Sequence, residues 1–326
     1  MERPKSFLII QTAFIGDVIL ATALIEKLHS YYPDAAIDFL VRKGNEGLLA
    51  GHPHLREVIV FDKKGKYRNL LLIIQKIRRT RYDVLINVQR YATTGLIAAL
   101  SKAKQRIGFD KNPLSFFNTT TITHQANHIH EVERNQKLIE AFTDGKAAKP
   151  KLYPSASDWN FVQTYQQGKY FCMAPTSVWF TKQWPVEKWI ELIQTVQKQV
   201  DFIYLLGAPS DHHVCESIRL VTGTNKVINL AGKLSFLQST ALISGAKMNY
   251  VNDSAPMHLA SSTNAPVTAI YCSTVPSFGF GPLSDQSVII ETKEKLTCRP
   301  CGSHGFKECP QGHFKCAYSI SMEQFA

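Results

Sequence analysis

Short apolar runs alternate with longer segments of helical periodicity along the whole chain, and this alternation restricts the possible folds more than any other feature. In the first half, apolar runs typical of strands fall at residues 6–11, 36–41, 58–62, 83–88 and 104–109. Apolar residues recur at helical spacing in the segments 17–32, 67–80 and 93–101, and again at 128–142, after a Thr- and Asn-rich loop at 110–127. Strands that alternate with helices predict a parallel sheet with helices on both faces.

The alternation breaks once and then starts again. Residues 145–158 hold two prolines among small and polar residues, which is typical of a linker, and a second series of strand and helix patterns follows. A chain of 326 residues suits two domains of about 150 residues each. We therefore predict the α/β class, with two doubly wound Rossmann-like domains at residues 1–150 and 151–326.

The loops that follow strands are the places to look for a site, because doubly wound sheets bind ligands beyond the carboxyl ends of their strands. In VNDSAPMHLAS (251–261), Pro256 suits the first turn of a helix, which Asp253 or Ser254 would cap. The N–H groups of that turn and the helix dipole favour a phosphate, and His258 can point at the same ligand. A plain capped helix with a buried histidine is an equally good explanation.

The loop TSVWFTKQWPVEKW (176–189) carries a second candidate. Lys182 stands just before Trp184 and Pro185, where a helix is expected to start, and a lysine there can neutralise a diphosphate. Trp184 is expected to lie in the core.

The loop TAFIGD (12–17) carries a third candidate. It has a single glycine, Gly16, so it is neither a dinucleotide fingerprint nor a Walker loop. What remains is a tight turn that presents Asp17. This residue either caps the following helix or acts as a general base that faces a cleft between the domains.

Basic residues are concentrated in the first half of the chain. Residues 1–155 contain 24 Lys and Arg against 14 Asp and Glu, a net charge of +10, whereas residues 156–326 contain 13 against 12. Between Lys63 and Arg106 twelve residues are basic and only Asp83 is acidic. This favours an anionic partner such as a membrane face or a phosphorylated substrate, although a solvated surface is the simpler reading. We expect no nucleic acid, because no recognition motif accompanies the charge.

The cysteines fall into two groups. Cys172, Cys215 and Cys272 stand singly in apolar or helical contexts and are expected to pack in the core. The other four form C-x2-C-x7-C-x6-C, with His304 and His313 between them, which raises a zinc site as a possibility. The four are Cys298, Cys301, Cys309 and Cys316.

The apolar run from Phe7 to Ile25 follows Arg3 and could be read as a targeting segment. Gln11 and Asp17 interrupt it, and no cleavage site ends it. We interpret it as a buried strand followed by a helix and expect a cytoplasmic protein.

Taken together and in order, the loops resemble those of the ADP-heptose:lipopolysaccharide heptosyltransferases, glycosyltransferase family nine. The matching landmarks are GDVILAT, VWFTKQWP, LLGAPSDH, NLAGK, NDSAPMHLA, GPLS and CRPC…CPQGHFKC. The resemblance covers nearly the whole chain. It implies a GT-B fold, in which two Rossmann-like domains face a central cleft, and metal-independent enzymes without a cofactor. The family ending also weighs against the zinc interpretation.

The resemblance also implies roles for individual residues. Asp17 matches the proposed catalytic base, Lys182 the phosphate-binding lysine, and Asp253, Ser254, Ala255 and His258 the motif D-T-G-x-x-H that holds the nucleotide diphosphate. Ser254 and Ala255 depart from that motif, which has threonine and glycine there. Where some members carry a ribose-binding glutamate, this chain has Pro209, with Asp211 further on.

Three further expectations complete the site. Thr176 and Ser177 are expected to contact the donor, and Arg90, Lys63 and Lys64 the acceptor, because the first domain of this fold usually takes it. The family implies a lipid A–inner-core acceptor, an anionic glycolipid, at the cytoplasmic face of the inner membrane, with peripheral association.

We therefore expect an inverting glycosyltransferase that moves heptose from ADP-heptose to the lipopolysaccharide core. Two alternatives stay open. One is another GT-B enzyme, such as a nucleotide-sugar epimerase, which needs no acceptor. The other is a non-catalytic binder of an anionic glycolipid, suggested by residues 63–106.

Overall fold

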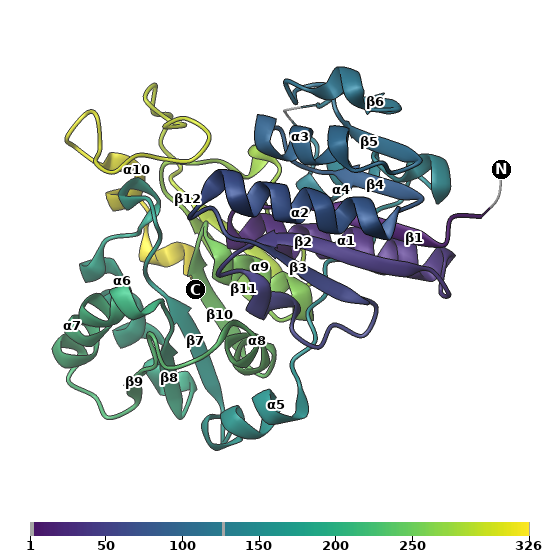
Figure 1. Ribbon diagram of the computed structural model, residues 1–326. Helices are drawn as coiled ribbons and strands as arrows, with labels where there is room; N and C mark the ends of the chain where they lie inside the picture. The colour runs from purple at the N-terminus through teal and green to yellow at the C-terminus, as the bar shows by residue number, and fades with distance from the viewer. Residues whose placement is uncertain (1–2, 126–127, 326) are drawn as a thin grey trace. The chain divides into compact units, whose positions relative to one another are not determined.

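The computed structural model describes residues 3–125 and 128–325, which form two units, Met1–Tyr153 and Pro154–Ala326. Each unit is a parallel sheet with helices on both faces (Figure 1). Among the described residues, no helix combines the length and apolar character needed to cross a membrane.

The first unit is built on a six-stranded sheet in the order β3-β2-β1-β4-β5-β6, and every neighbouring pair is parallel. Its strands are β1 (Ser6–Ile10), β2 (Ala36–Arg42), β3 (Glu57–Phe61), β4 (Val84–Asn87), β5 (Gln105–Phe109) and β6 (Thr120–Ile122). The central strands are buried along almost their whole length, as expected for a sheet covered on both faces.

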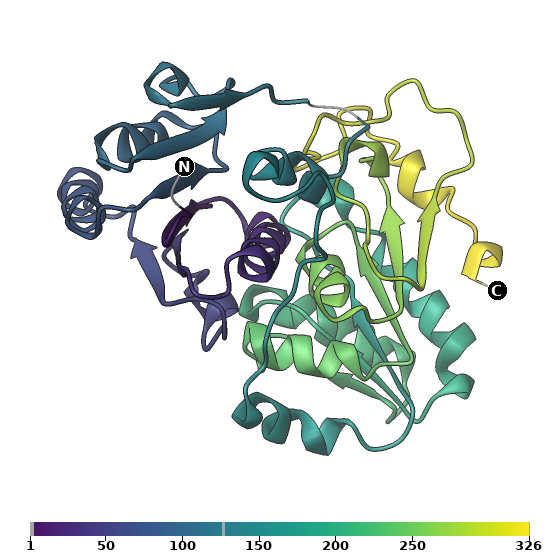
Figure 2. The same ribbon diagram turned by 90° about the vertical axis from the view of Figure 1, so that its right-hand side faces the viewer.

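Helices cover the two faces of this sheet in pairs. The α-helices of the unit are α1 (Ile15–Tyr31), α2 (Lys66–Thr80), α3 (Ala92–Leu100) and α4 (Glu131–Gln136). Figure 2 shows α2 and α3 on one face and α1 and α4 on the other, and the members of each pair touch. Short 3-10 turns are η1 (Glu46–Leu49), η2 (Ser115–Phe117) and η3 (Glu140–Phe142).

Two expectations for the end of this unit were wrong. The predicted helix at 128–142 is helical only in α4 and η3, and the predicted loop at 110–127 contains β6. The helix stops because its polar side chains bind backbone groups outside it. Gln136 donates a 2.6 Å hydrogen bond to the carbonyl of Asp144, and Arg134 donates to the carbonyls of Gln125 and Ile129.

The second unit repeats the first topology, with the order β12-β11-β10-β7-β8-β9 and parallel neighbours throughout. Its strands are β7 (Tyr170–Ala174), β8 (Phe202–Leu205), β9 (Val227–Asn229), β10 (Met248–Asn252), β11 (Val267–Tyr271) and β12 (Ser287–Glu291). Its α-helices are α5 (Ala156–Val162), α6 (Val186–Val196), α7 (His212–Thr222), α8 (Phe236–Ser244), α9 (Ala255–Thr263) and α10 (Lys315–Tyr318). Its 3-10 turns are η4 (Gln163–Tyr165), η5 (Phe180–Lys182), η6 (Gln197–Gln199), η7 (Pro209–Asp211), η8 (Pro276–Phe278) and η9 (Met322–Phe325). The predicted linker at 145–158 ends early, because Ser155 caps α5.

Both strand orders reverse direction at one place, and this is where such sheets bind ligands. The switch point lies between β1 and β4 in the first unit and between β7 and β10 in the second. Asp17 follows β1 and Lys182 follows β7, so each predicted residue stands at a switch point.

Candidate functional site

A buried ion pair lies at the switch point of the second unit. The Lys182 Nζ is 2.7 Å from Asp253 Oδ2, and the same carboxylate accepts a 2.6 Å hydrogen bond from the Thr274 hydroxyl. The two charged side chains are only 15% and 8% exposed. The structure thus brings together the predicted lysine, which follows β7, and the predicted aspartate, which follows β10.

Asn252, the last residue of β10, holds the loop that carries Lys182. Its side-chain oxygen accepts a 3.0 Å hydrogen bond from the backbone N–H of Trp184, and its amide donates weakly to the carbonyls of Ala174 and Thr176. Trp184 is fully buried and packs edge-on against Trp189, so its predicted core position is confirmed. The loop that carries Lys182 is therefore held at both ends by a buried amide on the neighbouring strand.

The helix α9 begins at this edge. Ser254 is its N-cap residue, Ala255 is its first residue, and Pro256 lies in the first turn. The Ser254 hydroxyl makes no capping hydrogen bond, and Asp253 binds Lys182 and Thr274. The N-terminus of α9 is a place where N–H groups and the helix dipole favour an anion. His258 is buried in this helix, and Thr176 is buried on the loop after β7.

The cysteine-containing segment near the C-terminus packs against the loop that carries Lys182 and against the residues that follow β11. The Thr181 hydroxyl accepts a 2.7 Å hydrogen bond from the N–H of Phe306 and a 3.0 Å hydrogen bond from the Ser273 hydroxyl. The carbonyl of Ser273 accepts from the N–H of Cys301 at 2.8 Å. A Cβ on Gly305 would lie 2.8 Å from the Thr181 hydroxyl oxygen, so the segment approaches as closely as a glycine permits.

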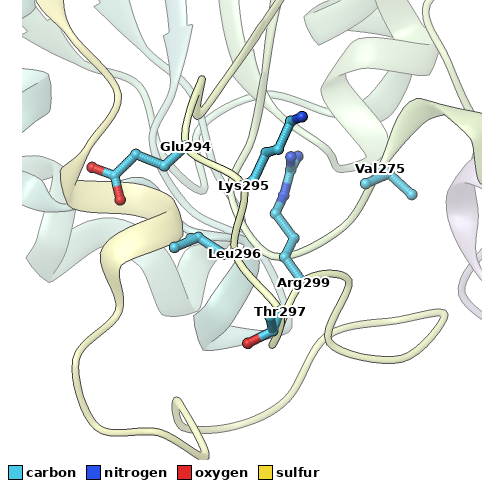
Figure 3. Close-up of a pocket in the computed structure, with 6 residues that line it drawn as sticks. All are labelled: Val275, Glu294, Lys295, Leu296, Thr297 and Arg299. Carbon is cyan, nitrogen blue, oxygen red and sulfur yellow. The ribbon is translucent and has the colours of Figure 1, made fainter.

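Arg299 ties this segment to the end of β11. Its guanidinium donates to the carbonyls of Tyr271, Cys272 and Thr274 and pairs with Glu291 at 2.7 Å. Beside it is a hollow of about 370 Å³, and Figure 3 shows the Lys295 and Arg299 side chains directed the same way while Glu294 turns aside. The hollow is lined by Val275, Glu294, Lys295, Leu296, Thr297 and Arg299. The predicted donor-binding residues, all of which are described, do not line it.

The four clustered cysteines are free thiols in this structure. Cys298 Sγ lies 3.9 Å from His313 Nε2. Burial raises the pKa of Cys316 to about 12 and raises the pKa of Cys301, so both thiols are protonated at neutral pH. Across residues 3–125 and 128–325, no three His, Cys, Asp or Glu side chains converge on a point that could hold a metal ion. The zinc interpretation therefore finds no support in the geometry.

In the first unit, Asp17 lies in the first turn of α1, and its carboxylate accepts a 3.2 Å hydrogen bond from the N–H of Phe14. The capping role considered for this residue is therefore present. A capping carboxylate at the carboxyl edge of the sheet is also placed to meet a ligand, so the cap and the catalytic role are compatible. The role of general base stays a prediction.

Buried amides hold the loop that carries Asp17. The Gln11 side-chain oxygen accepts from the N–H of Ala13 and from the Gln89 amide, which joins the loops after β1 and β4. Asn112 donates to the carbonyls of Gln89 and Tyr91 and so adds the loop after β5. Buried polar groups with satisfied partners rigidify the backbone around them. The sequence reasoning missed this network.

A second group of residues that was not predicted from the sequence surrounds Glu131. This buried carboxylate forms an ion pair with Arg134, whose guanidinium is also buried. Burial raises the pKa of Glu131 to about 7; the nearby charge of Asp17 adds to that rise, while those of Arg134 and Arg90 oppose it. The burial of His124, together with the charges of Arg90 and Arg134, lowers its pKa to about 4. Asp17 and Arg90 therefore belong to one electrostatic cluster.

The three predicted acceptor residues lie at the same edge of the sheet but on different loops. Arg90 is exposed on the loop after β4, and Lys63 and Lys64 follow β3. Arg42, at the end of β2, lies between these positions, and its guanidinium stands 5.0 Å from the ring centroid of Phe14. Arg42 was not predicted, because a lone arginine at a strand end gives no distinctive sequence signal.

Two Rossmann-like sheets of this strand order are the architecture of the GT-B fold. A solved structure from Veillonella parvula, described as a glycosyl transferase family 9 protein, matches this chain with a TM-score of 0.81 and 22% sequence identity. The match covers 90% of this chain and 87% of that chain. The Escherichia coli structure described as ADP-heptose lps heptosyltransferase II has a TM-score of 0.77, at 21% identity, and the match covers 98% and 100%. These likenesses confirm the predicted fold.

Sequence comparison then identifies the family. Residues 70–309 match the family model described as glycosyltransferase family 9 (heptosyltransferase). The chain therefore belongs to this family and is a glycosyltransferase. A curated relative, the lipopolysaccharide core heptosyltransferase OpsX of Haemophilus influenzae, is 26% identical over 281 residues, or 83% of this chain and 80% of the relative. The predicted resemblance and the predicted enzyme class are confirmed.

Proposed function

We propose that this glycosyltransferase moves heptose from ADP-heptose to the inner core of lipopolysaccharide, with inversion at the anomeric carbon and without a metal ion. The observation that carries the proposal is the buried Lys182–Asp253 pair beside the N-terminus of α9. An ammonium group and a helix N-terminus at one sheet edge form a site for a diphosphate. The names of the relatives support heptose as the sugar.

In this proposal the second unit binds the donor. Lys182 faces the diphosphate, with Thr176, Ser177 and the backbone of Ser254 and Ala255 at the same edge. Asp253 holds the lysine in place, and His258 lies in the first turns of α9. As the bond between the anomeric carbon and ADP breaks, negative charge grows on the diphosphate, and these groups stabilise it. One such preorganised contact is worth about 2.7–4 kcal/mol.

The first unit would supply the acceptor contacts and the base. Asp17 takes the proton from the acceptor hydroxyl, whose oxygen forms the new bond to the anomeric carbon on the face opposite ADP. Arg90, Lys63 and Lys64 would bind anionic groups of the lipid A–inner-core acceptor. This acceptor is a membrane glycolipid, so we place the enzyme in the cytoplasm, peripherally associated with the inner membrane. No cofactor takes part in the proposed reaction.

The test is the release of ADP from ADP-heptose, with and without a truncated lipid A–inner-core acceptor. We expect release only when the acceptor is present. Release of ADP without any acceptor would point to a hydrolase. Isomerisation of the nucleotide sugar without any acceptor would point to an epimerase. An intact donor with every heptose acceptor would show that the enzyme uses a different nucleotide sugar.

A further inference from the structure

One face of the first unit exposes large apolar side chains that its core does not use. On α2, Leu70, Ile73, Ile74 and Ile77 pack inward against the sheet, whereas Tyr67, Leu71 and Leu72 point outward. Tyr67 is 79% exposed and Leu71 is 60% exposed. The inward residues form part of the core, and the outward ones take no part in it.

Neighbouring elements extend this surface. Helix α3 packs against α2 and exposes Leu96 and Leu100, and the η2 turn packs against α3 and exposes Phe116 and Phe117. Figure 2 shows α2, α3 and the η2 turn along one side of the unit. We call this surface the apolar–basic face, made up of Tyr67, Leu71, Leu72, Leu96, Leu100, Phe116 and Phe117. Single exposed apolar residues are ordinary, but a gathering on adjacent elements marks an interaction site.

The charge around the face shows what kind of partner it fits. The segment from Lys63 to Arg106, which includes α2 and α3, has twelve basic residues and one acidic residue. Exposed members of this set on α2 are Arg68, Lys76, Arg78 and Arg79, and Lys76 is paired with Glu57. Exposed aromatic and aliphatic side chains interspersed with basic residues are the pattern of a surface that lies on an anionic bilayer. Each basic residue near such a surface contributes attraction to the lipid phosphates.

Other partners fit these residues less well. A second copy of the chain would place one strongly basic face against another. A nucleic acid would use the charge and the aromatic rings but would leave Leu71, Leu72, Leu96 and Leu100 without a partner. An anionic bilayer accounts for both the charge and the leucines.

We propose that the first unit docks on an anionic lipid bilayer through the apolar–basic face. This deepens the proposed function and rests on it in one respect, which is that the acceptor is itself a membrane glycolipid. Lys63 and Lys64, proposed for the acceptor, directly precede α2, so the docking surface begins where the acceptor contacts begin.

The experiment is co-sedimentation of the full chain with vesicles, without donor or acceptor. Vesicles of phosphatidylethanolamine and phosphatidylglycerol in equal parts are compared with vesicles of phosphatidylcholine alone. The wild type binds the anionic vesicles, and the double variant Leu71→Ser/Phe116→Ser binds them roughly tenfold more weakly or worse. The matched control is Leu220→Ser/Val221→Ser on α7, where two side chains of similar exposure are removed from the second unit. This control binds like the wild type.

Several outcomes overturn the proposal. These are equal binding to phosphatidylcholine, no loss in the Leu71/Phe116 variant, or a change confined to self-association or nucleic-acid binding. ADP release with a water-soluble acceptor fragment is measured in parallel and stays at the wild-type rate in both double variants. If the wild type binds vesicles but shows no acceptor-dependent release of ADP, the proposed function is refuted and the docking surface stands. If it releases ADP but does not bind vesicles, the docking surface is refuted and the proposed function stands.

Discussion

The two units share one strand order but exchange the charges at their switch points. In the first unit the acidic Asp17 follows the first strand and the basic Arg90 follows the fourth; in the second unit the basic Lys182 follows the first strand and the acidic Asp253 follows the fourth. The second pair is in direct contact at 2.7 Å. In the first unit, the charges of Asp17 and Arg90 both act on Glu131, with opposite effects on its pKa.

In the proposed function, this difference lets one topology serve two substrates. A lysine held by a buried aspartate presents a fixed positive charge, which suits a diphosphate. In the same proposal, a carboxylate on a loop fixed by buried amides is suited to accept a proton, and the basic residues around it would attract an anionic acceptor. The sheet fixes where the loops meet, and the loop residues decide the chemistry.

The largest expected effect is from Asp17→Asn. Loss of a general base lowers turnover by about 10²–10⁴-fold, because asparagine cannot take the acceptor proton. The matched control is Asp158→Asn, since Asp158 accepts from the N–H of Ser155 at the start of α5 as Asp17 accepts from Phe14. Steady-state turnover near the wild-type rate for Asp158→Asn, with a large loss for Asp17→Asn, separates catalysis from capping. If turnover fell equally in the Asp17 and Asp158 variants, the role of Asp17 would be limited to capping its helix.

A somewhat smaller loss is expected from Lys182→Ala, about 10²–10³-fold in turnover. This change also leaves the Asp253 carboxylate buried without its cation, so the melting temperature falls. Adding Asp253→Asn removes that charge, and the double variant regains much of the melting temperature while turnover stays low. Recovery of turnover in the double variant would show that the pair is structural only.

A third prediction concerns acid stability of the first unit. Burial, followed by the charges of His54, His29 and Lys151, lowers the pKa of His52 to about 4. An unfolded histidine titrates near pH 6.5, so the unfolded state binds more protons below that pH and stability is lost as the pH falls from 6.5 toward 4. The groups that face His52 closely are Glu26, at 3.5 Å, the ring of Tyr153, and His54, whose N–H and ring both contact the His52 ring.

The variant His52→Asn tests this prediction. Asparagine can replace the ring nitrogen that accepts from the N–H of His54, but it does not titrate. Melting temperatures measured between about pH 7 and pH 4.5 fall less steeply in the variant than in the wild type. Parallel curves for the two proteins would assign the acid sensitivity to other groups.

The smallest effect is expected from Thr181→Val, which probes the support of Lys182 by the C-terminal segment. The change leaves the N–H of Phe306 without its 2.7 Å acceptor, at a cost of about 1–3 kcal/mol. The control Thr240→Val removes a hydroxyl that donates within α8, to the carbonyl of Phe236. Affinity for ADP, measured by calorimetry, falls several-fold in the Thr181 variant only. An unchanged affinity would limit the segment to a packing role.

Local patterns were enough to predict the two sheets and the loops that carry Asp17, Lys182 and Asp253. Strand and helix periodicities are local, and a parallel sheet places the carboxyl ends of its strands at one edge. The Lys182–Asp253 ion pair itself was not predicted. The structure shows that the strands before these two residues meet at the switch point, and this brings the two predicted loops together.

Burial, and contacts between segments far apart in the sequence, could not be predicted from local patterns. Glu131 and Arg134 are three residues apart and look like a surface helix pair, and only the fold shows that they are buried. The hydrogen bond from Asn112 to the carbonyl of Gln89 and the contact of Phe306 with Thr181 join residues with no shared local pattern. Polar residues that hold loops therefore had to be found in the structure.

The most direct test of the division between the units is the Kd of ADP-heptose, measured by calorimetry for the wild type, Asp17→Asn and Lys182→Ala. If the second unit holds the donor and the first supplies the base, Asp17→Asn binds ADP-heptose like the wild type. Lys182→Ala then binds it at least about tenfold more weakly. An equal loss of affinity in both variants, or a loss in Asp17→Asn alone, would contradict the account.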